Sequence, residues 1–249
     1  MKIVKKILLF SLAALGILAL GGMLTIKIMD DPQPTGKAGE PADEFAQKIM
    51  KSVDIAAWDT TRIVAWDFAG QNAHVWDRKR HIASVSWGNK QVLIDLTTKK
   101  GKAYKDGEQV PAEDAEKLLK SAWKKWVNDS FWLNPLAKLY DQGTSREIVN
   151  LKKGGKGLKI TYSSGGVTPG DSYLWIVDEN YRPTAWKMWV KIIPVGGMEF
   201  SWEGWQQLST GAWVSNLHKG TFTLKLENIQ GATHWSQLYK KDPFAELVQ

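Results

Sequence analysis

The acidic pair Glu199 and Glu203 is one arrangement in this 249-residue sequence whose residue types and spacing suit catalysis. In a strand, whose side chains alternate with a period of two, both carboxylates lie on one face, and paired carboxylates perform glycoside hydrolysis. Two acids on an outer strand face are, however, far more often solvated surface residues. His74 and His81 lie near an expected turn, with no acid at a familiar metal-ligand spacing. The sequence therefore predicts neither a metal site nor a catalytic carboxylate pair.

Nucleophile and phosphate-binding motifs are also missing from the sequence. The chain has no Cys, which excludes a thiol nucleophile, a thiolate metal site, a disulfide framework and a lipidated Cys. It has no Gly-x-Ser-x-Gly pattern, and the glycine-rich run at residues 152–157 lacks the P-loop spacing and suits a hairpin turn. We therefore expect a protein that is not an enzyme and that uses no cofactor.

Tryptophan is the unusual residue type, with 14 copies in the chain. A large aromatic surface suits the wall of an apolar cavity, and burial of a long acyl chain supplies on the order of 10 kcal/mol at about 25 cal/mol per Å². The alternative is that the rings simply fill the core, as buried aromatic side chains usually do. The residues expected to line such a ligand-binding cavity are Trp66, Phe68, Trp76, Trp87, Trp123, Trp126, Phe131, Trp132, Trp175, Trp186 and Trp202.

The first 29 residues have the pattern of a targeting segment. Three lysines within residues 1–6 precede residues 7–26, which carry no charge and are just long enough to cross a bilayer. A cleavable signal peptide is the alternative, because Ala19-Leu20-Gly21 fits a small-x-small cleavage site. By the positive-inside rule, everything after Met29 is exported. We expect a periplasmic domain in the cell envelope, anchored in the inner membrane, or secreted if the signal is cleaved.

The charge of the chain belongs largely to this segment. The formal net charge is +7, and the first 29 residues contain four Lys and no acid, which leaves 29 basic and 26 acidic residues and a net charge of +3. Such a small excess over about 220 residues forms no basic stripe, so nucleic acid is not an expected partner.

The rest of the chain divides into a linker at residues 30–41, rich in Pro and Gly, and one domain at residues 42–249. Apolar residues at helical spacing predict helices at residues 43–57 and 111–127, and a second short helix at residues 128–140 that is broken near Pro135. A period of two predicts strands at residues 62–69, 73–78, 81–87, 91–97, 103–104, 146–151, 158–162, 173–178, 183–193, 198–207, 213–217 and 222–229.

Alternation along these strands defines the expected fold class. In residues 158–162, for example, Leu158, Ile160 and Tyr162 oppose Lys159 and Thr161. Such alternation is typical of a large antiparallel sheet with one covered face, and so many strands must curl. The prediction is an α+β fold, a strongly curved antiparallel half-barrel of about 11 strands wrapped over helices. Trp189 and Trp205 have the opposite parity to Trp186 and Trp202, so we expect them on the polar face, unless a bulge or a loop covers them.

Several segments resemble proteins of the lipoprotein carrier fold, named after LolA and LolB. They are residues 126–133 (WVNDSFWL), 135–139 (PLAKL), 141–143 (DQG) and 167–178 (VTPGDSYLWIVD), followed by Pro183. The local sequence is most similar to uncharacterised envelope proteins of this fold, common in Bacteroidetes-type bacteria, over residues 41–227. The resemblance implies an open half-barrel that closes over helices around a hydrophobic cavity, and it implies acyl-chain binding. The chain departs from LolB because it has no Cys to acylate.

The functional expectation combines the tryptophan excess with this resemblance. It is an exported protein that binds a lipid, a lipoprotein acyl chain or another hydrophobic ligand, with residues 128–143 as a mobile rim of the cavity or only as a helix cap. One alternative is a glycan binder that uses exposed Trp rings as stacking platforms. Another is a sensor or scaffold that engages a second envelope protein.

Overall fold

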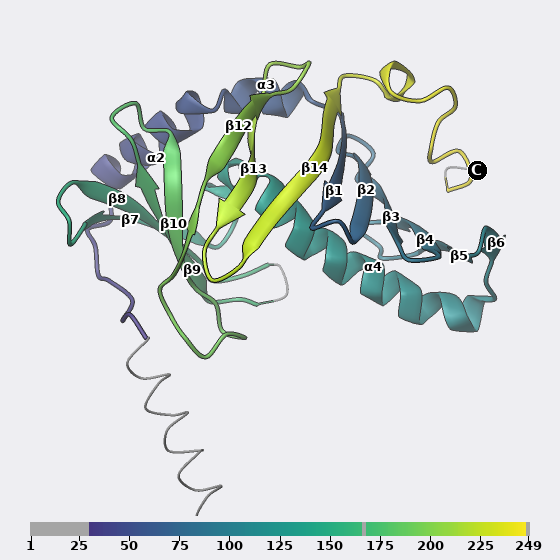
Figure 1. Ribbon diagram of the computed structural model, residues 1–249, viewed down its shortest axis with the longest axis horizontal. Coiled ribbons are helices and arrows are strands. Elements are labelled where there is room, and N and C mark those ends of the chain that lie inside the picture. Colours follow the sequence, from purple (N-terminus) through teal and green to yellow (C-terminus); the bar gives the residue numbers. More distant parts are fainter. Residues whose placement is uncertain (1–29, 166–167, 248–249) are drawn as a thin grey trace, which may run out of the picture.

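Strands dominate the part of the chain that the computed structural model describes, residues 30–165 and 168–247 (Figure 1). The expected signal or anchor segment at residues 1–29 lies outside these described residues. Among the helices that the structure describes, none has both the length and the apolar composition needed to cross a bilayer.

Nine strands form the larger of two antiparallel sheets. Asp106 and Gly107 both have positive φ (53° and 84°) in one of its hairpin turns, the conformation that an Asp-Gly pair favours. Across the sheet the strands are β12 (Glu203–Gln207), β13 (Trp213–Lys219), β14 (Thr223–Ala232), β1 (Ile63–Phe68), β2 (Asn72–Asp77), β3 (Ile82–Trp87), β4 (Lys90–Asp95), β5 (Gly101–Lys105) and β6 (Glu108–Gln109).

Five strands form the second sheet, and the chain passes from it to the first sheet at Trp202. Residues 198–207, expected as one strand, are therefore two strands in different sheets. The expected single curved sheet is likewise two sheets, and neither closes into a barrel over the described residues. In order across the sheet the strands are β11 (Met198–Ser201), β10 (Pro183–Trp189), β9 (Asp171–Val177), β8 (Lys156–Tyr162) and β7 (Thr144–Asn150).

Helix α4 (Ala112–Leu133) is the longest described helix and is continuous where two helices were expected. Its first turn contains Glu113 and Asp114, whose negative charges are stabilised by the positive end of the helix dipole. It ends before Asn134 because the residue that precedes a proline avoids the helical conformation. A short 3-10 helix, η1 (Pro135–Lys138), replaces the end of the predicted second helix.

The other helical segments are short and surround the sheets. Helix α2 (Glu40–Ser52) begins with Pro41 in its first turn, packs against β7 and β8, and is followed by α3 (Ile55–Thr60). Near the C-terminus, η2 (Trp235–Gln237) precedes a segment whose Phe244 is buried against β3 and β4.

One hydrophobic core joins both sheets and the helices. Helix α4 contacts β3, β4, β5 and β13, so it lies along one face of the larger sheet (Figure 1). Ala42, Ala46 and Ile49 of α2 are buried in the same core as Trp66 of β1 and Trp186 of β10. The end of α4 therefore lies where side chains from both sheets meet.

Candidate functional site

Nine aromatic rings meet at the end of α4, between the five-stranded sheet and β13; we call this group the aromatic cluster. Two rings come from the last turn of α4, and the others come from β8, β9, β10, β11, β13 and the junction between the sheets. The members of the aromatic cluster are Phe131, Trp132, Tyr162, Tyr173, Trp175, Trp186, Phe200, Trp202 and His218.

Trp186 is the centre of the aromatic cluster. Its ring centroid lies 4.8 Å from that of Trp132, 5.1 Å from that of Trp175 and 5.0 Å from that of Trp202. The ring planes are tilted by 49° to 71°, the range of arrangements in which aromatic quadrupoles attract one another. All four indoles are buried, so the cluster is a packed aromatic interior.

Polar atoms inside the aromatic cluster lack partners. The indole N–H groups of Trp175, Trp186 and Trp202 are buried and find no acceptor among the described residues. Trp66, Trp76 and Trp126, nearer the larger sheet, have the same unpaired N–H group. A buried donor without an acceptor costs about 1–3 kcal/mol. An acceptor atom placed beside any of these six N–H groups would therefore be stabilising.

His218 adds an unpaired acceptor to the aromatic cluster. Its Nδ1 donates to the backbone carbonyl of Ser201 at 3.2 Å, which leaves Nε2 as a buried acceptor with no donor among the described residues. Burial lowers the pKa of His218 to about 4, so the ring is neutral at physiological pH. The ring lies 4.3 Å from that of Trp202, centroid to centroid. The aromatic cluster thus contains both unpaired donors and an unpaired acceptor.

Tyr162 and Tyr173 complete the aromatic cluster on the side of β8 and β9. Burial raises the pKa of both phenols well above 10, so both keep their protons. Their rings contact Phe131 of α4 at centroid distances of 5.5 and 5.0 Å.

A buried carboxylate ties α4 to the larger sheet. Asp129 of α4 accepts hydrogen bonds from His74 Nε2 at 2.7 Å and from Asn72 Nδ2 at 2.8 Å, both on β2. Asn128 donates to its other oxygen at 2.8 Å. The His74 ring stacks on Trp66 with a centroid distance of 4.5 Å. These contacts fix the register of α4 on the sheet.

The eleven aromatic residues predicted from the sequence all belong to the one hydrophobic core, but in two groups. Five lie in the aromatic cluster: Phe131, Trp132, Trp175, Trp186 and Trp202. Six lie over the larger sheet: Trp66, Phe68, Trp76, Trp87, Trp123 and Trp126.

Four cluster members were not predicted as site residues: Tyr162, Tyr173, Phe200 and His218. Strand parity carries a signal for three of them. Tyr162 follows Leu158 and Ile160 on one face, Tyr173 shares a face with Trp175, and Phe200 shares a face with Trp202. No comparable sequence signal identifies His218, because its role depends on the passage of the chain between the sheets.

Trp189 and Trp205, the two tryptophans of opposite parity, are covered by neighbouring segments. The Trp189 indole donates to the Asp31 carbonyl at 2.6 Å, and that of Trp205 donates to the Pro183 carbonyl at 3.2 Å. Both rings are partly buried, so each lies beneath a neighbouring segment and neither forms an open aromatic platform.

The block at residues 128–143 is part of the core. Its first six residues belong to α4, and Leu136 and Leu139 are buried. Asp141 pairs with Lys138 at 2.9 Å on the surface. The block therefore connects α4 to β7 and also supplies two rings of the aromatic cluster.

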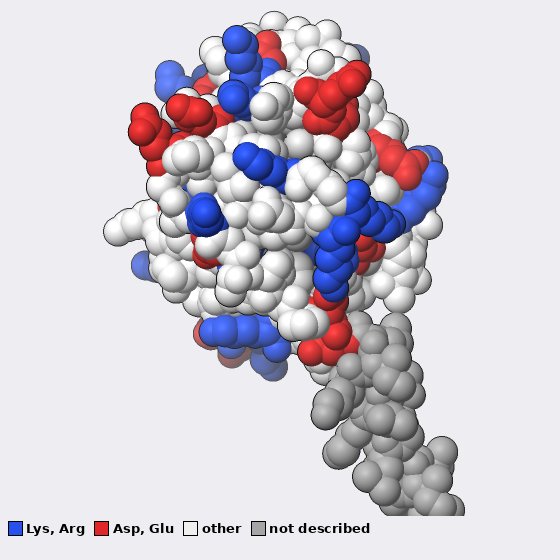
Figure 2. Space-filling view, turned by 90° about the vertical axis from the view of Figure 1, so that its left-hand side faces the viewer, with Lys and Arg blue, Asp and Glu red and all other residues white. Residues whose placement is uncertain are grey.

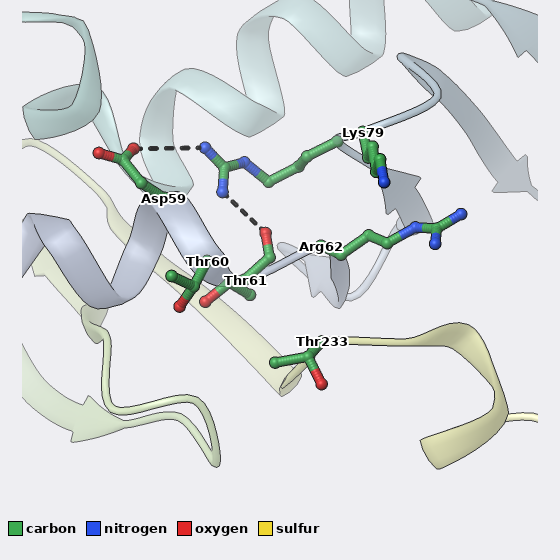
Figure 3. A pocket seen from close by; sticks show the side chains of 7 residues that line it. Asp59, Thr60, Thr61, Arg62, Lys79 and Thr233 are labelled. Atoms are coloured by element: carbon green, nitrogen blue, oxygen red, sulfur yellow. Dashed lines mark hydrogen bonds and ion pairs between the residues drawn. The ribbon is translucent and has the colours of Figure 1, made fainter.

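Two surface pockets lie away from the aromatic cluster. One, of about 360 Å³, is mostly apolar and includes Met50, Ile55 and Tyr140. The other, of about 390 Å³, lies at the end of α3 and is lined by Asp59, Thr60, Thr61, Arg62, Arg78, Lys79 and Thr233 (Figure 3).

Both arginines of the polar pocket already have structural partners. Arg78 donates to the Thr61 carbonyl at 2.7 Å and lies over the Trp58 ring, 4.6 Å from its centroid. Arg62 lies 3.2 Å from the buried carboxylate of Asp77. The polar pocket is therefore a surface depression where α3, β1 and β2 meet. None of the eleven predicted residues lines this pocket.

The acids considered for catalysis do not meet. Glu199 is in β11 and Glu203 in β12, so they belong to different sheets. Lys219 lies 2.7 Å from Glu203, and Lys187 lies 3.9 Å from Glu199. Within residues 30–165 and 168–247, no three His, Asp or Glu side chains are grouped in a way that could hold a metal ion.

Comparisons with known proteins give one described neighbour. No family model matches the sequence, and no curated protein matches it. A solved structure of a DUF1329 family protein from Desulfovibrio piger is similar with a TM-score of 0.43 and 8% sequence identity, over 81% of this chain and 100% of that chain.

Proposed function

We propose that the protein binds a lipid, a lipoprotein acyl chain or another hydrophobic molecule non-covalently in the aromatic interior beside α4. The ligand would lie between the second half of α4 and the five-stranded sheet, against the aromatic cluster. The protein would act as a binding protein and not as an enzyme, in the periplasmic part of a cell envelope.

The observation that carries this proposal is the set of unpaired polar atoms within an apolar interior. An acyl chain is held by burial alone, but its ester or carboxyl oxygens need donors. The indole N–H groups of Trp175, Trp186 and Trp202 are such donors, and no protein acceptor among the described residues competes for them. A molecule with an apolar chain and a few oxygen atoms matches this lining better than a pure hydrocarbon does.

Binding would require space that the packed rings now fill. We propose that the strands act as the half-barrel of a lipoprotein carrier, with the end of α4 and residues 128–143 as the moving rim. The end of α4 is suited to this role because Phe131 and Trp132 meet the five-stranded sheet through contacts between aromatic rings. Asp129 would stay fixed on β2 and serve as the pivot.

Photolabelling of the full chain tests the proposal. The protein would be produced in a bacterium fed palmitate that carries a diazirine, irradiated in the cell, purified and digested. We expect labelled peptides from β9, β10 or the second half of α4. Trp186→Phe keeps a ring at the centre of the aromatic cluster and removes its donor, so labelling should fall about two- to tenfold, the value of one hydrogen bond.

Trp235→Phe is the matched control, because Trp235 lies in η2, outside the core. Its labelling should equal that of the unchanged protein. Labelling confined to residues 1–29 would contradict binding in the interior. A tryptophan fluorescence change with soluble glycans would then favour the glycan binder, and a partner protein retained after delipidation would favour the scaffold.

A further inference from the structure

The loop between β10 and β11, residues 190–197, presents apolar side chains to solvent. Its sequence is Val-Lys-Ile-Ile-Pro-Val-Gly-Gly. Ile192 is 76% exposed, the highest value among the exposed large hydrophobic residues of the described chain, and Pro194 is exposed as well. An exposed isoleucine next to a lysine is unfavourable in water and suits the boundary between lipid chains and headgroups.

The start of the described chain is fastened to this loop. Gly196 accepts a hydrogen bond from the Asp31 backbone N–H at 3.2 Å, and its own N–H donates to the Asp30 carboxylate at 2.7 Å. The indole of Trp189, at the end of β10, donates to the Asp31 carbonyl. The chain at residues 30–31 is therefore a fixed point on the domain.

Two ion pairs strengthen this attachment. Lys152 and Lys187 place their ammonium groups 2.8 and 2.9 Å from the two oxygens of the Asp31 carboxylate. Their hydrogen bonds lower the pKa of Asp31, so the carboxylate stays charged to a lower pH than that of an ordinary Asp. Figure 2 shows acidic and basic side chains gathered side by side where the described chain begins.

The sequence limits how far this fixed point can lie from a membrane. Residues 7–26 carry no charge, and twenty helical residues rise about 30 Å, the thickness of the hydrocarbon core. Only residues 27–29 separate this segment from Asp30, and three extended residues span at most about 10 Å. If residues 7–26 span a bilayer, a domain held at Asp30 and Asp31 sits directly on the surface of that bilayer.

We propose that the β10–β11 loop is a membrane-contact element that inserts Ile192 into the outer edge of the bilayer entered by residues 7–26. The contacts of Asp30 and Asp31 orient the domain so that this loop faces the lipid. The β10–β11 loop and the β13–β14 turn, which carries the half-exposed Phe222, lie at the same end of the molecule as the start of the described chain (Figure 1).

Lys191 fits the same surface. It is exposed and precedes Ile192, and a lysine at this position can extend its ammonium group to lipid phosphates while its stem stays in the apolar layer. The inference does not depend on a ligand in the aromatic interior. It depends on residues 7–26 remaining attached and spanning a bilayer.

Site-specific fluorescence tests this orientation in the full chain. The chain has no Cys, so Ile192→Cys gives one attachment site for a nitrobenzoxadiazole fluorophore. In nanodiscs of phosphatidylethanolamine and phosphatidylglycerol, we expect spin-labelled lipids to quench this fluorophore several-fold more strongly than one at Lys79→Cys. Lys79 is exposed and lies beside α3, at the other end of the molecule (Figure 1).

Asp31→Ala in the Ile192→Cys background tests the attachment. Loss of both ion pairs should loosen the attachment, which the contacts of Gly196 and Trp189 hold in part, and reduce lipid quenching at residue 192, while the protein stays in the membrane. Equal lipid quenching at residues 192 and 79, or unchanged quenching with Asp31→Ala, would overturn the inference. So would a mature protein that lacks residues 1–29. None of these results depends on photolabelling of the interior, so the two proposals can fail separately.

Discussion

Asp129 is a buried carboxylate whose energetic cost is offset by three donors. His74, Asn72 and Asn128 all donate to it, and Lys125 in turn donates to the side-chain amide oxygen Oδ1 of Asn72 at 2.9 Å. Removal of one partner from such a network leaves the others buried and unpaired, which costs more than the intact contacts contribute.

We therefore expect Asp129→Ala to lower the free energy of unfolding by about 3 kcal/mol or more, measured by urea denaturation. Asp141→Ala is the matched control, because Asp141 pairs with Lys138 on the surface, and it should change stability by less than about 1 kcal/mol. Equal losses in the two variants would show that the buried network contributes no more than a surface pair.

We expect the buried His218 to make the stability of the protein depend on pH. Burial lowers its pKa to about 4, whereas an unfolded His has a pKa near 6.5. Between these values the unfolded chain binds a proton that the folded protein does not, so stability falls as the pH drops from about 6.5 to 4. The full shift corresponds to about 3 kcal/mol.

The measurement is urea denaturation at several pH values, with His218→Phe for comparison. The variant keeps a ring beside Trp202 and should lose less stability across this window. Carboxylates such as Asp77 and Asp31, whose pKa values are lowered by Arg or Lys partners, lose their contribution at lower pH and affect both proteins alike. Identical pH profiles for the two proteins would contradict the assignment.

At the scale of elements, the close approach of strands β4 and β5 requires a glycine at one position. Gly101 of β5 pairs with Ile94 of β4, and a Cβ atom at Gly101 would lie 1.9 Å from the Leu93 carbonyl oxygen. No rotation of a side chain relieves a clash with backbone. Strands β4 and β5 must separate to admit any other residue.

Gly101→Ala should therefore destabilise the fold by about 1–3 kcal/mol, the usual cost of overpacking, as measured by thermal or urea unfolding. Lys105→Ala at the exposed end of the same strand is the control and should lie within about 0.5 kcal/mol of the unchanged protein. A stability equal to that of this control would mean that β5 is held only loosely against β4.

The elements themselves were largely predictable, and their partners were not. Alternation marks the strands because one face of each sheet is buried, as Leu158 and Ile160 illustrate. Residues 198–207 keep this alternation through Trp202. The change of parity at Trp205 marks the place where hydrogen bonding passes from β10 to β13, but it does not reveal the new partner strand. The expected end of the long helix at Val127 was wrong, because Asp129 bonds to His74 and Asn72 of β2 from within α4. The break expected near Pro135 lies where α4 ends.

In the candidate site too, the residues were predictable from the sequence and their contacts with one another were not. The sequence identifies Trp175, Trp186 and Trp202 as inward-facing, and the structure packs their rings together. Which of the eleven predicted residues meet one another depends on how two sheets and a helix are placed, which is a long-range property. The six residues over the larger sheet therefore separate from the aromatic cluster, and His218 joins it without a sequence signal.

At the scale of the whole molecule, the two sheets share one core. Ala83 and Val85 of β3 belong to the same hydrophobic core as Trp175 of β9, and the chain crosses between the sheets at Trp202. Neither sheet can lose its partner without exposing aromatic area, and that loss is large because a buried aromatic side chain covers about 150–250 Å². The sheets should therefore unfold together, as small single domains usually do.

Hydrogen exchange followed by mass spectrometry in increasing urea tests this cooperativity. Peptides from β3 in the larger sheet and β9 in the smaller one should converge on one free energy of opening and one urea dependence. Peptides from residues 235–247, which lie at the edge of the fold, should exchange through local opening with little urea dependence. A lower opening energy that persists for β9 would mean that the five-stranded sheet is a separate unit. The aromatic cluster would then mark an interface between two units, where a ligand can enter without disturbing the larger sheet.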